Sequence, residues 1–305
     1  MALMRSRVAA DPRNSRKGRR VSRRNGTRRR RLVPALQQLE PRHLLAFSAN
    51  VFADINLFGV SSIPDSFVEF GDEVFFVAND GRTGSELWKS DGSEEGTALV
   101  ADINPGPNGS LPSDLVVFGN DLFFTALDED DEFDIWKSDG TTEGTVKVFD
   151  ADAEGVYEIQ QLTPSGERIF FTAFEFDSGY ELWATDGTSS GTALVKDINL
   201  DQGISEPPRE LTDVDGTLFF TSYSNGYDNR ELWKSNGTAI GTVLVANVDE
   251  KPLESSSPRN LTNVGGTLYF AADDPDTGVE LYKSGGTEAT TVLVEDLNVG
   301  FVSSY

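Results

Sequence analysis

The stretch ELWKSDG at residues 86–92 decides the fold, because the chain repeats it four more times. The later versions read DIWKSDG, ELWATDG, ELWKSNG and ELYKSGG, and their aromatic residues follow one another at spacings of 48, 47, 50 and 49 residues. A period near 50 over five repeats is typical of a propeller, a solenoid or another repeat array. The aromatic positions are Trp88, Trp136, Trp183, Trp233 and Tyr282.

Each repeat contains four short runs rich in β-branched and aromatic residues, such as LTDV, TLFFTSY, ELWKS and TVLVA within residues 211–246. Gly, Asp and Asn separate the runs, as in hairpin turns. Neighbouring residues such as Phe75 and Phe76 put apolar groups on both faces of a sheet, so both faces must be covered. The sequence therefore predicts an all-β fold, a β-propeller-like array of five four-stranded antiparallel repeats, with a linear stack of β repeats as the alternative.

The ends of the repeat region leave its closure open. VFADIN at residues 51–56 resembles the last strand of a repeat, as in LVADIN at residues 99–104, and could complete the sheet of the final repeat. The final repeat has such a strand of its own, VLVEDLN, and the VGFVSSY that follows resembles the lead into another repeat. Either one strand is surplus or the chain is a shortened member of a longer array. The last repeat is also degenerate, with Thr290 in place of a glycine.

Charge divides the chain into two parts. Residues 1–46 carry 14 Lys and Arg against two acidic residues, a net charge of +12, and the remainder carries −36, which together give −24. This segregation predicts a basic, disordered export or targeting segment at 1–46 and an acidic repeat domain at 47–305. We expect no nucleic-acid partner for so acidic a domain, no transmembrane segment, and a monomer.

Two parts of the chain resemble known bacterial families. LEPRHLL at residues 39–45 resembles the LEPRxLL segment near the start of large surface and exported proteins. The repeated phrase resembles the ELWxxDGT repeat of secreted and surface proteins, over nearly all of residues 51–300. The resemblance implies secretion or a cell-surface location through a non-standard N-terminal segment, and it implies no established activity. His43, the only histidine, is expected to be incidental.

The residue before the conserved glycine of the motif indicates a turn rather than a chemical site. It is Asp in three repeats, Asn in the fourth and Gly in the fifth, and these residue types share tolerance of turn conformations but not a carboxylate. The positions assigned a structural role, besides the five aromatic residues, are Asp91, Gly92, Asp139, Gly140, Asp186, Gly187, Asn236, Gly237 and Gly286.

Function is then expected in the loops between the second and third strands, which vary in sequence and lie at one face of the meanders. Their carboxylate, aromatic and arginine side chains would suit a glycan or another surface or extracellular protein. The candidate binding residues are Asp80, Arg82, Glu175, Asp177, Tyr223, Tyr227, Asp228 and Arg230.

Two acidic clusters in these loops offer oxygen ligands for Ca²⁺, although neither has the spacing of an EF-hand loop. A solvated acidic surface is the alternative, and no other cofactor is required. The candidate ligands are Asp128, Asp130 and Asp131 in the second repeat, and Asp273, Asp274 and Asp276 in the fifth.

Two functions compete on this evidence. The first is a non-catalytic extracellular or cell-surface module for adhesion, ligand binding or structural spacing. The alternative is a propeller hydrolase or lyase that acts on polysaccharide through paired carboxylates. We assign no catalytic residue, because no His, Cys or metal cluster distinguishes one repeat from the others, and a single active site usually needs such asymmetry. The sequence therefore favours the module.

Overall fold

A computed structural model describes residues 53–56, 59, 61–129, 132–198, 206–223, 230–246, 248, 256–274 and 277–297. The chain divides into two compact units, Met1–Ala49 and Asn50–Tyr305, and every described residue belongs to the second. The basic segment expected at 1–46 thus lies outside the described residues. Within the described part of the chain, no helix has the length and apolar character needed to cross a membrane.

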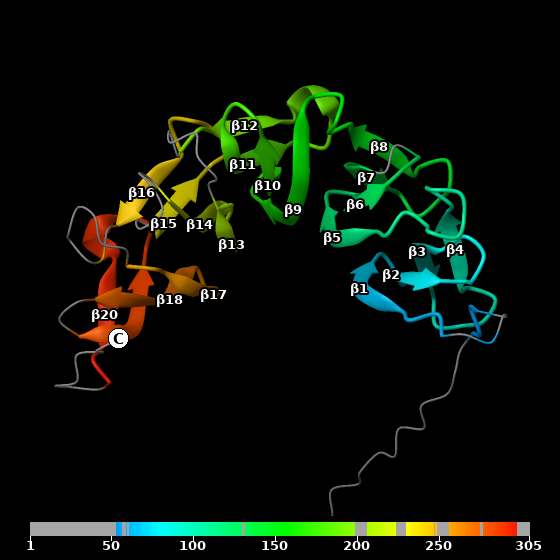
Figure 1. Cartoon of the computed structure of the whole chain (residues 1–305). Helices are drawn as coiled ribbons and strands as arrows, with labels where there is room; N and C mark the ends of the chain where they lie inside the picture. Colours follow the sequence, from blue (N-terminus) through cyan, green and yellow to red (C-terminus); the bar gives the residue numbers. More distant parts are fainter. Residues whose placement is uncertain are drawn as a thin grey trace, which may run out of the picture. The chain divides into compact units, whose positions relative to one another are not determined.

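In the described part of the chain, five antiparallel sheets follow one another, and each contains four strands in the order of the sequence (Figure 1). The first is β1 (Asp65–Phe70), β2 (Glu73–Asn79), β3 (Ser85–Ser90) and β4 (Ala98–Ala101). The second is β5 (Ser113–Phe118), β6 (Asp121–Leu127), β7 (Phe133–Ser138) and β8 (Val146–Phe149). The third is β9 (Val156–Ser165), β10 (Arg168–Glu175), β11 (Gly179–Thr185) and β12 (Ala193–Lys196).

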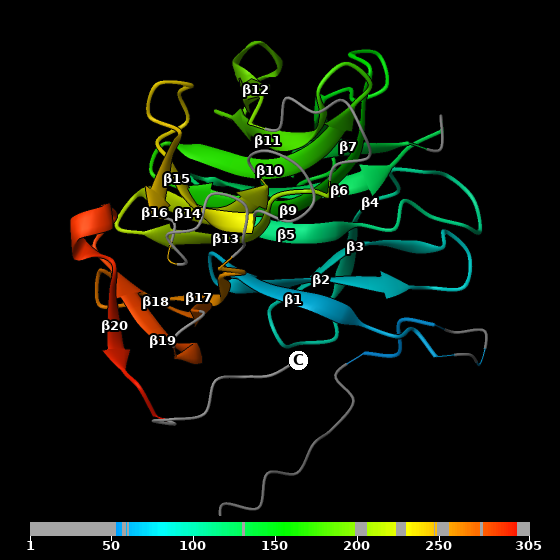
Figure 2. The same ribbon diagram turned by 60° about the vertical axis from the view of Figure 1, so that its left-hand side comes forward.

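The fourth sheet is β13 (Arg209–Val214), β14 (Thr217–Tyr223), β15 (Arg230–Ser235) and β16 (Val243–Ala246). The fifth is β17 (Arg259–Val264), β18 (Thr267–Asp274), β19 (Gly278–Ser284) and β20 (Val292–Glu295). Short 3₁₀ helices, η1 (Ser189–Gly191) and η2 (Glu288–Thr290), precede the last strands of the third and fifth sheets. The same order of sheets can be followed from another side in Figure 2.

The main contacts between described strands of different sheets all involve a first strand: β1 with β5, β5 with β9, β9 with β13, and β13 with β17. The first strands lie toward the centre of Figure 1 and the fourth strands lie on its rim. Sheets that meet at one edge and spread at the other are arranged radially, as in a propeller. The predicted β-propeller-like array of five four-stranded repeats is therefore confirmed.

The core lies between consecutive sheets. Phe75 and Leu87 of the first sheet pack on Leu122, Phe124 and Ala126 of the second, and all five side chains are buried. The clusters between the later sheets join equivalent positions. Both faces of the inner sheets are therefore covered by neighbouring repeats, as the paired apolar residues predicted.

The motif aspartate forms the same turn in repeat after repeat. Asp91 Oδ1 accepts a hydrogen bond from Ser93 N at 2.9 Å, and Asp139 Oδ1 accepts one from Thr141 N at 2.9 Å. Asn236 Oδ1 makes the equivalent bond with Thr238 N at 3.1 Å. An amide oxygen replaces a carboxylate oxygen here without loss of the bond, so the turn does not depend on negative charge.

The last repeat contains a compensating exchange rather than a simple degeneration. A side chain at Gly96 of the first repeat would lie 2.0 Å from Asp91 Oδ1, so that turn requires a glycine there. In the fifth repeat Gly285 occupies the aspartate position and Thr290 occupies the glycine position. Thr290 Oγ1 accepts a hydrogen bond from Thr287 N at 3.1 Å, as the aspartate oxygen does elsewhere. The side chain that closes the turn has moved to the other end of it.

A β-bulge interrupts the first strand of every sheet. Its central residue has a positive φ, between 52° and 62°, although none is a glycine. The bulges also connect neighbours: Asp114 Oδ2 accepts from Gln161 N at 2.7 Å, and Glu210 Oε2 accepts from Leu261 N at 3.2 Å. The residues concerned are Ser66, Asp114, Gln161, Glu210 and Asn260.

The predicted strand at residues 51–56 is wrong for its described part, because residues 53–56 form no strand. The fifth sheet already has β20 as its fourth strand. Asn56 is instead buried against the first sheet, where its Nδ2 donates to the carbonyl of Asn79 at 3.3 Å. The resemblance to LVADIN reflected composition, whereas strand formation needs a free neighbouring edge to pair with.

Candidate functional site

The predicted binding loops join second to third strands and therefore lie at the same end of each sheet. Asp80 Oδ1 accepts hydrogen bonds from Arg82 N at 2.7 Å and Thr83 N at 2.8 Å, which closes its own loop. Glu175 Oε2 accepts from Ser178 Oγ at 3.0 Å beside the exposed Asp177.

In the fourth sheet, the Arg230 guanidinium lies 4.4 Å from the ring centre of Tyr223. Its Nη2 also contacts Glu206 Oε2 at 3.3 Å. Tyr227 and Asp228 lie outside the described residues. These contacts hold each loop to its own sheet, and they do not bring the candidate residues of different sheets into one constellation.

The proposed Ca²⁺ ligands are only partly described. Asp130, Asp131 and Asp276 lie outside the described residues. Asp274 Oδ2 accepts a hydrogen bond from the Tyr282 hydroxyl at 3.1 Å, and its Oδ1 accepts from Thr277 N at 3.3 Å. Asp128 belongs to a different cluster, which it forms with a lysine.

That cluster surrounds Lys147 on β8. Lys147 Nζ lies 2.5 Å from Asp128 Oδ2, 2.7 Å from Asp134 Oδ2 and 3.7 Å from Asp150 Oδ2. The Asp134 side chain is 1% exposed, whereas that of Asp150 is 49% exposed, so the cluster extends from the interior to solvent. Carboxylate oxygens of Asp134, Asp150 and Asp152 lie within 4.8 Å of one another and could together hold a cation.

The cluster exists because the second repeat differs from the others at two positions. Lys147 pairs with Trp136 across the sheet, where the other repeats place leucine beside the motif aromatic residue. Asp134 stands where the other repeats have glutamate. The shorter acid leaves space for the lysine, and its Oδ1 still accepts from Ala151 N at 2.8 Å. This is the asymmetry that the sequence analysis did not find.

Burial raises the pKa of Asp134, against the opposing effect of its hydrogen bond with Lys147. Burial alone would lower the pKa of Lys147, but its hydrogen bonds with Asp128 and Asp134 raise that pKa above the ordinary value. The lysine therefore remains a cation, unsuited to nucleophilic work, and the carboxylates are the groups that can exchange protons. The site therefore contains two carboxylates, those of Asp128 and Asp134, that are held together by the Lys147 ammonium group.

The glutamate at the position of Asp134 in the other repeats has a structural role, as Glu86 of the first repeat shows. Glu86 is fully buried and accepts from Ser110 N at 2.8 Å, from Ile103 N at 3.2 Å and from the Ser110 hydroxyl. It thereby fastens the connection that leads to the next sheet. Burial raises the pKa of Glu86 to about 7, despite these hydrogen bonds.

The free energy of unfolding is therefore expected to fall as the pH rises from 4.5 to 7. The native state binds the Glu86 proton more tightly than the unfolded chain, so this contribution is complete below pH 4.5 and is lost as pH passes about 7. The shift corresponds to about 3 kcal/mol. Urea titrations across this range should show a flatter profile for Glu86→Gln, and the exposed-site control Glu94→Gln should keep the wild-type slope. An unchanged slope in Glu86→Gln would refute the assignment.

Neither a protein-family model nor the sequence of a curated protein matches the chain. Solved structures match its fold at low identity. A puromycin hydrolase mutant is 16% identical with a TM-score of 0.47, over 76% of this chain and 39% of that one. The β-propeller domain of the trilobed protease from Pyrococcus furiosus is 14% identical with a TM-score of 0.46, over 79% and 70%. A prolyl endopeptidase is 12% identical with a TM-score of 0.49, over 77% and 36%.

The chain thus spans less than half the length of the puromycin hydrolase and the prolyl endopeptidase it matches. The matched structures are named as a puromycin hydrolase, the propeller domain of a protease and a prolyl endopeptidase, and none of them is named as an adhesion or spacing module. The expectation of a non-catalytic extracellular module is corrected on this ground. The second repeat also differs from the others at the Lys147 cluster, in lysine and aspartate residues rather than in the His, Cys or metal cluster that the expectation considered.

Proposed function

We propose that the chain is a propeller hydrolase that acts on polysaccharide, with Asp128 and Asp134 as its two working carboxylates. The observation that carries the proposal is their shared contact with Lys147 Nζ, at 2.5 and 2.7 Å. Because both oxygens contact one nitrogen, they lie at most about 5 Å from each other, which is closer to the spacing of retaining than of inverting glycoside hydrolases. The other four repeats have leucine in place of this lysine.

The two carboxylates are suited to different roles. Asp134 is the more deeply buried, and its raised pKa favours the protonated form that a general acid needs. It would give its proton to the leaving glycosidic oxygen while Asp128 bonds to the sugar carbon, and water would then release the sugar. Lys147 holds both carboxylates and neutralises the developing negative charge. The resemblance of residues 39–45 to LEPRxLL supports placing this activity at the cell surface or outside the cell.

The test is release of reducing ends from a panel of neutral and acidic polysaccharides by the full chain. Asp134→Asn and Asp128→Asn should each lower the rate by about a hundredfold or more, since general acid–base catalysis contributes on that order. Glu231→Gln changes the same motif position in the fourth repeat and should retain the wild-type rate. Circular dichroism should confirm that all variants fold. Absence of release from every polysaccharide, or a wild-type rate in folded Asp134→Asn, would overturn the proposal.

A further inference from the structure

Consecutive sheets are joined by one recurring contact, in which a phenylalanine of one repeat rests on the motif glycine of the next. A methyl group added at Gly140 would lie 3.0 Å from Cζ of Phe75. The same construction gives 2.9 Å between Gly187 and Phe123 and 3.1 Å between Gly286 and Phe219; at Gly237 the side chain of Arg168 is nearest, at 2.5 Å, and Phe170 follows at 3.5 Å. The glycine is needed there for its positive φ and also for the space that the ring occupies.

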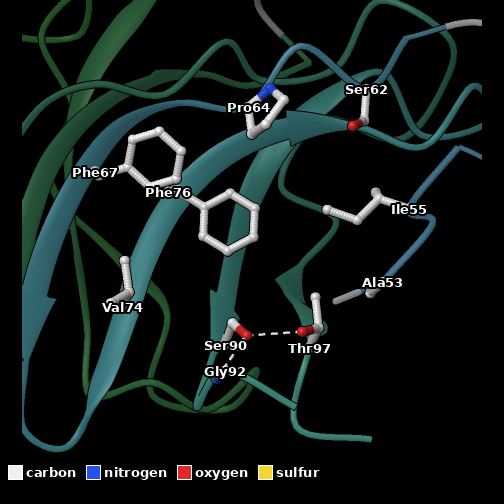
Figure 3. A pocket seen from close by; sticks show the side chains of 10 residues that line it. All are labelled: Ala53, Ile55, Ser62, Pro64, Phe67, Val74, Phe76, Ser90, Gly92 and Thr97. Atoms are coloured by element: carbon white, nitrogen blue, oxygen red, sulfur yellow. Dashed lines mark hydrogen bonds between the residues drawn. The ribbon is translucent and has the colours of Figure 1, made fainter. Parts of the chain in front are cut away.

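The first sheet has the glycine but not the ring. No described residue lies within 4 Å of the position that a side chain at Gly92 would take. Next to it is a cavity of about 440 Å³, lined by Phe67, Val74 and Phe76 on one side and by Ala53 and Ile55 on the other (Figure 3). In Figure 3, Gly92 lies at one end of this cavity, beside the hydrogen bond that joins Ser90 and Thr97 at 2.7 Å. A largely apolar space with room for an aromatic ring therefore lies where the later repeats hold a phenylalanine.

Exposure shows that, among the described residues, no neighbouring sheet covers this face of the first sheet. Val74 is 41% exposed, whereas the residues at its position in the other four sheets are 0% exposed. Phe67 is 62% exposed, while Leu162 and Leu261 at its position are 5% and 8% exposed. The residues equivalent to Val74 are Leu122, Ile169, Leu218 and Leu268.

The opposite face of the fifth sheet is uncovered in the complementary way. Leu281 is 39% exposed, whereas its equivalents are 0% exposed, and Val294 is 40% exposed where its equivalents are at most 8% exposed. Tyr269 occupies the position of the inserting phenylalanine and has no glycine to contact. The equivalents of Leu281 are Leu87, Ile135, Leu182 and Leu232, and those of Val294 are Val100, Val148, Val195 and Val245.

A polar contact extends the match. Lys234 pairs with Phe219 across the fourth sheet, and its Nζ donates to the carbonyl of Gly286 at 2.7 Å in the next repeat. Lys283 pairs with Tyr269 in the same way and is exposed. The fifth sheet thus presents a ring and a cation, and the first sheet presents the glycine that receives both groups at the contact between the fourth and fifth sheets.

We infer that the uncovered face of the fifth sheet binds the uncovered face of the first sheet of a second copy of this chain, head to tail. Tyr269 enters the cavity at Gly92, and Lys283 donates to the Gly92 carbonyl. The occupant is a second copy because, among the described residues, none of the chain's own fifth sheet lies within 4 Å of the position that a side chain at Gly92 would take. The contact continues an interface that the described repeats already make four times. Being heterologous, it leaves a free face at each end and can extend.

Association should strengthen with salt, because each copy carries a net charge of −24 and the copies repel one another at low ionic strength. The expected result for the full chain in high salt is a sedimentation coefficient that rises with concentration. Val74→Asp removes the receiving face and Leu281→Asp removes the inserting face, so each variant alone should sediment as a monomer. An equimolar mixture of the two has one intact interface and should form dimers but nothing larger.

Val146→Asp is the matched control, because Val146 is 41% exposed on β8 in the second repeat, away from both end faces. It should associate as the wild type does. A wild-type chain that stays monomeric up to about 100 μM in high salt would overturn the inference, since even a weak specific interface associates in that range. Larger species that persist in both single variants would also overturn it. If both variants are monomers and their melting temperatures fall by the same amount relative to the wild type, the two faces contact each other within one chain. That result would also overturn the inference.

Discussion

Replacement of Trp183 by alanine is expected to lower the free energy of unfolding by about 3 to 5 kcal/mol, the usual cost of removing a large buried aromatic side chain. Trp183 is 7% exposed and packs between neighbours on both sides of its interface. Its ring centre lies 6.3 Å from that of Phe171 and 6.4 Å from that of Phe149. Chemical denaturation of the purified chain, monitored by circular dichroism, measures the change.

Trp88→Ala is the matched control, since Trp88 has the same motif position in the first sheet, where the face is uncovered and the side chain is half-buried. At protein concentrations low enough to keep the chain monomeric, its cost should be about half that of Trp183→Ala, because less apolar area leaves water in the folded state. Equal costs would mean that the first sheet is covered as fully as the third, against the exposures described above.

Replacement of Lys147 by methionine is expected to cost about 3 to 5 kcal/mol at neutral pH, because it leaves two carboxylates without their cation. Asp134 is 1% exposed, and the side chain of Asp128 is 13% exposed. The Asp134 pKa, already raised by burial, should rise further, so the loss should grow as the pH increases and should shrink on acidification. Urea titrations of the wild type and of Lys147→Met should therefore show a larger loss of stability at pH 8 than at pH 5.

Two controls accompany this experiment. Lys147→Arg retains the charge and should lose much less stability than Lys147→Met. Leu194→Met makes the same side chain at the equivalent position of the third repeat, where there is no carboxylate pair, and should cost less than about 1.5 kcal/mol. If Lys147→Met is as harmless as Leu194→Met, the cluster is a solvated surface pair rather than a buried one.

The strands could be predicted from the sequence because their signals are local. Paired aromatic residues such as Phe75 and Phe76 imply a sheet buried on both faces, and the fixed spacing implies five equal units. The bulges of the first strands could not be predicted, because Ser66, Gln161 and their equivalents share no residue type that favours a positive φ. There the backbone conformation follows from pairing with the second strand and contact with the next sheet.

The candidate site was missed because its signal was sought in the wrong residue types. A search for His, Cys or metal patterns passes over a leucine position that becomes Lys147 and a glutamate that becomes Asp134. Neither change belongs to a recognised catalytic or metal-binding motif, and only the register of β7 and β8 shows that the two residues meet. Comparison of each repeat position across the five repeats would have found both.

The exchange of Gly285 and Thr290 in the last repeat has a consequence for the design of artificial arrays. A consensus sequence averages each position separately, and it could join the aspartate of one repeat to the threonine of another. That hybrid would force a side chain to within 2.0 Å of the aspartate oxygen. The residues at these two positions are therefore compatible only as a pair, and a stable synthetic repeat must take both of them from the same natural repeat.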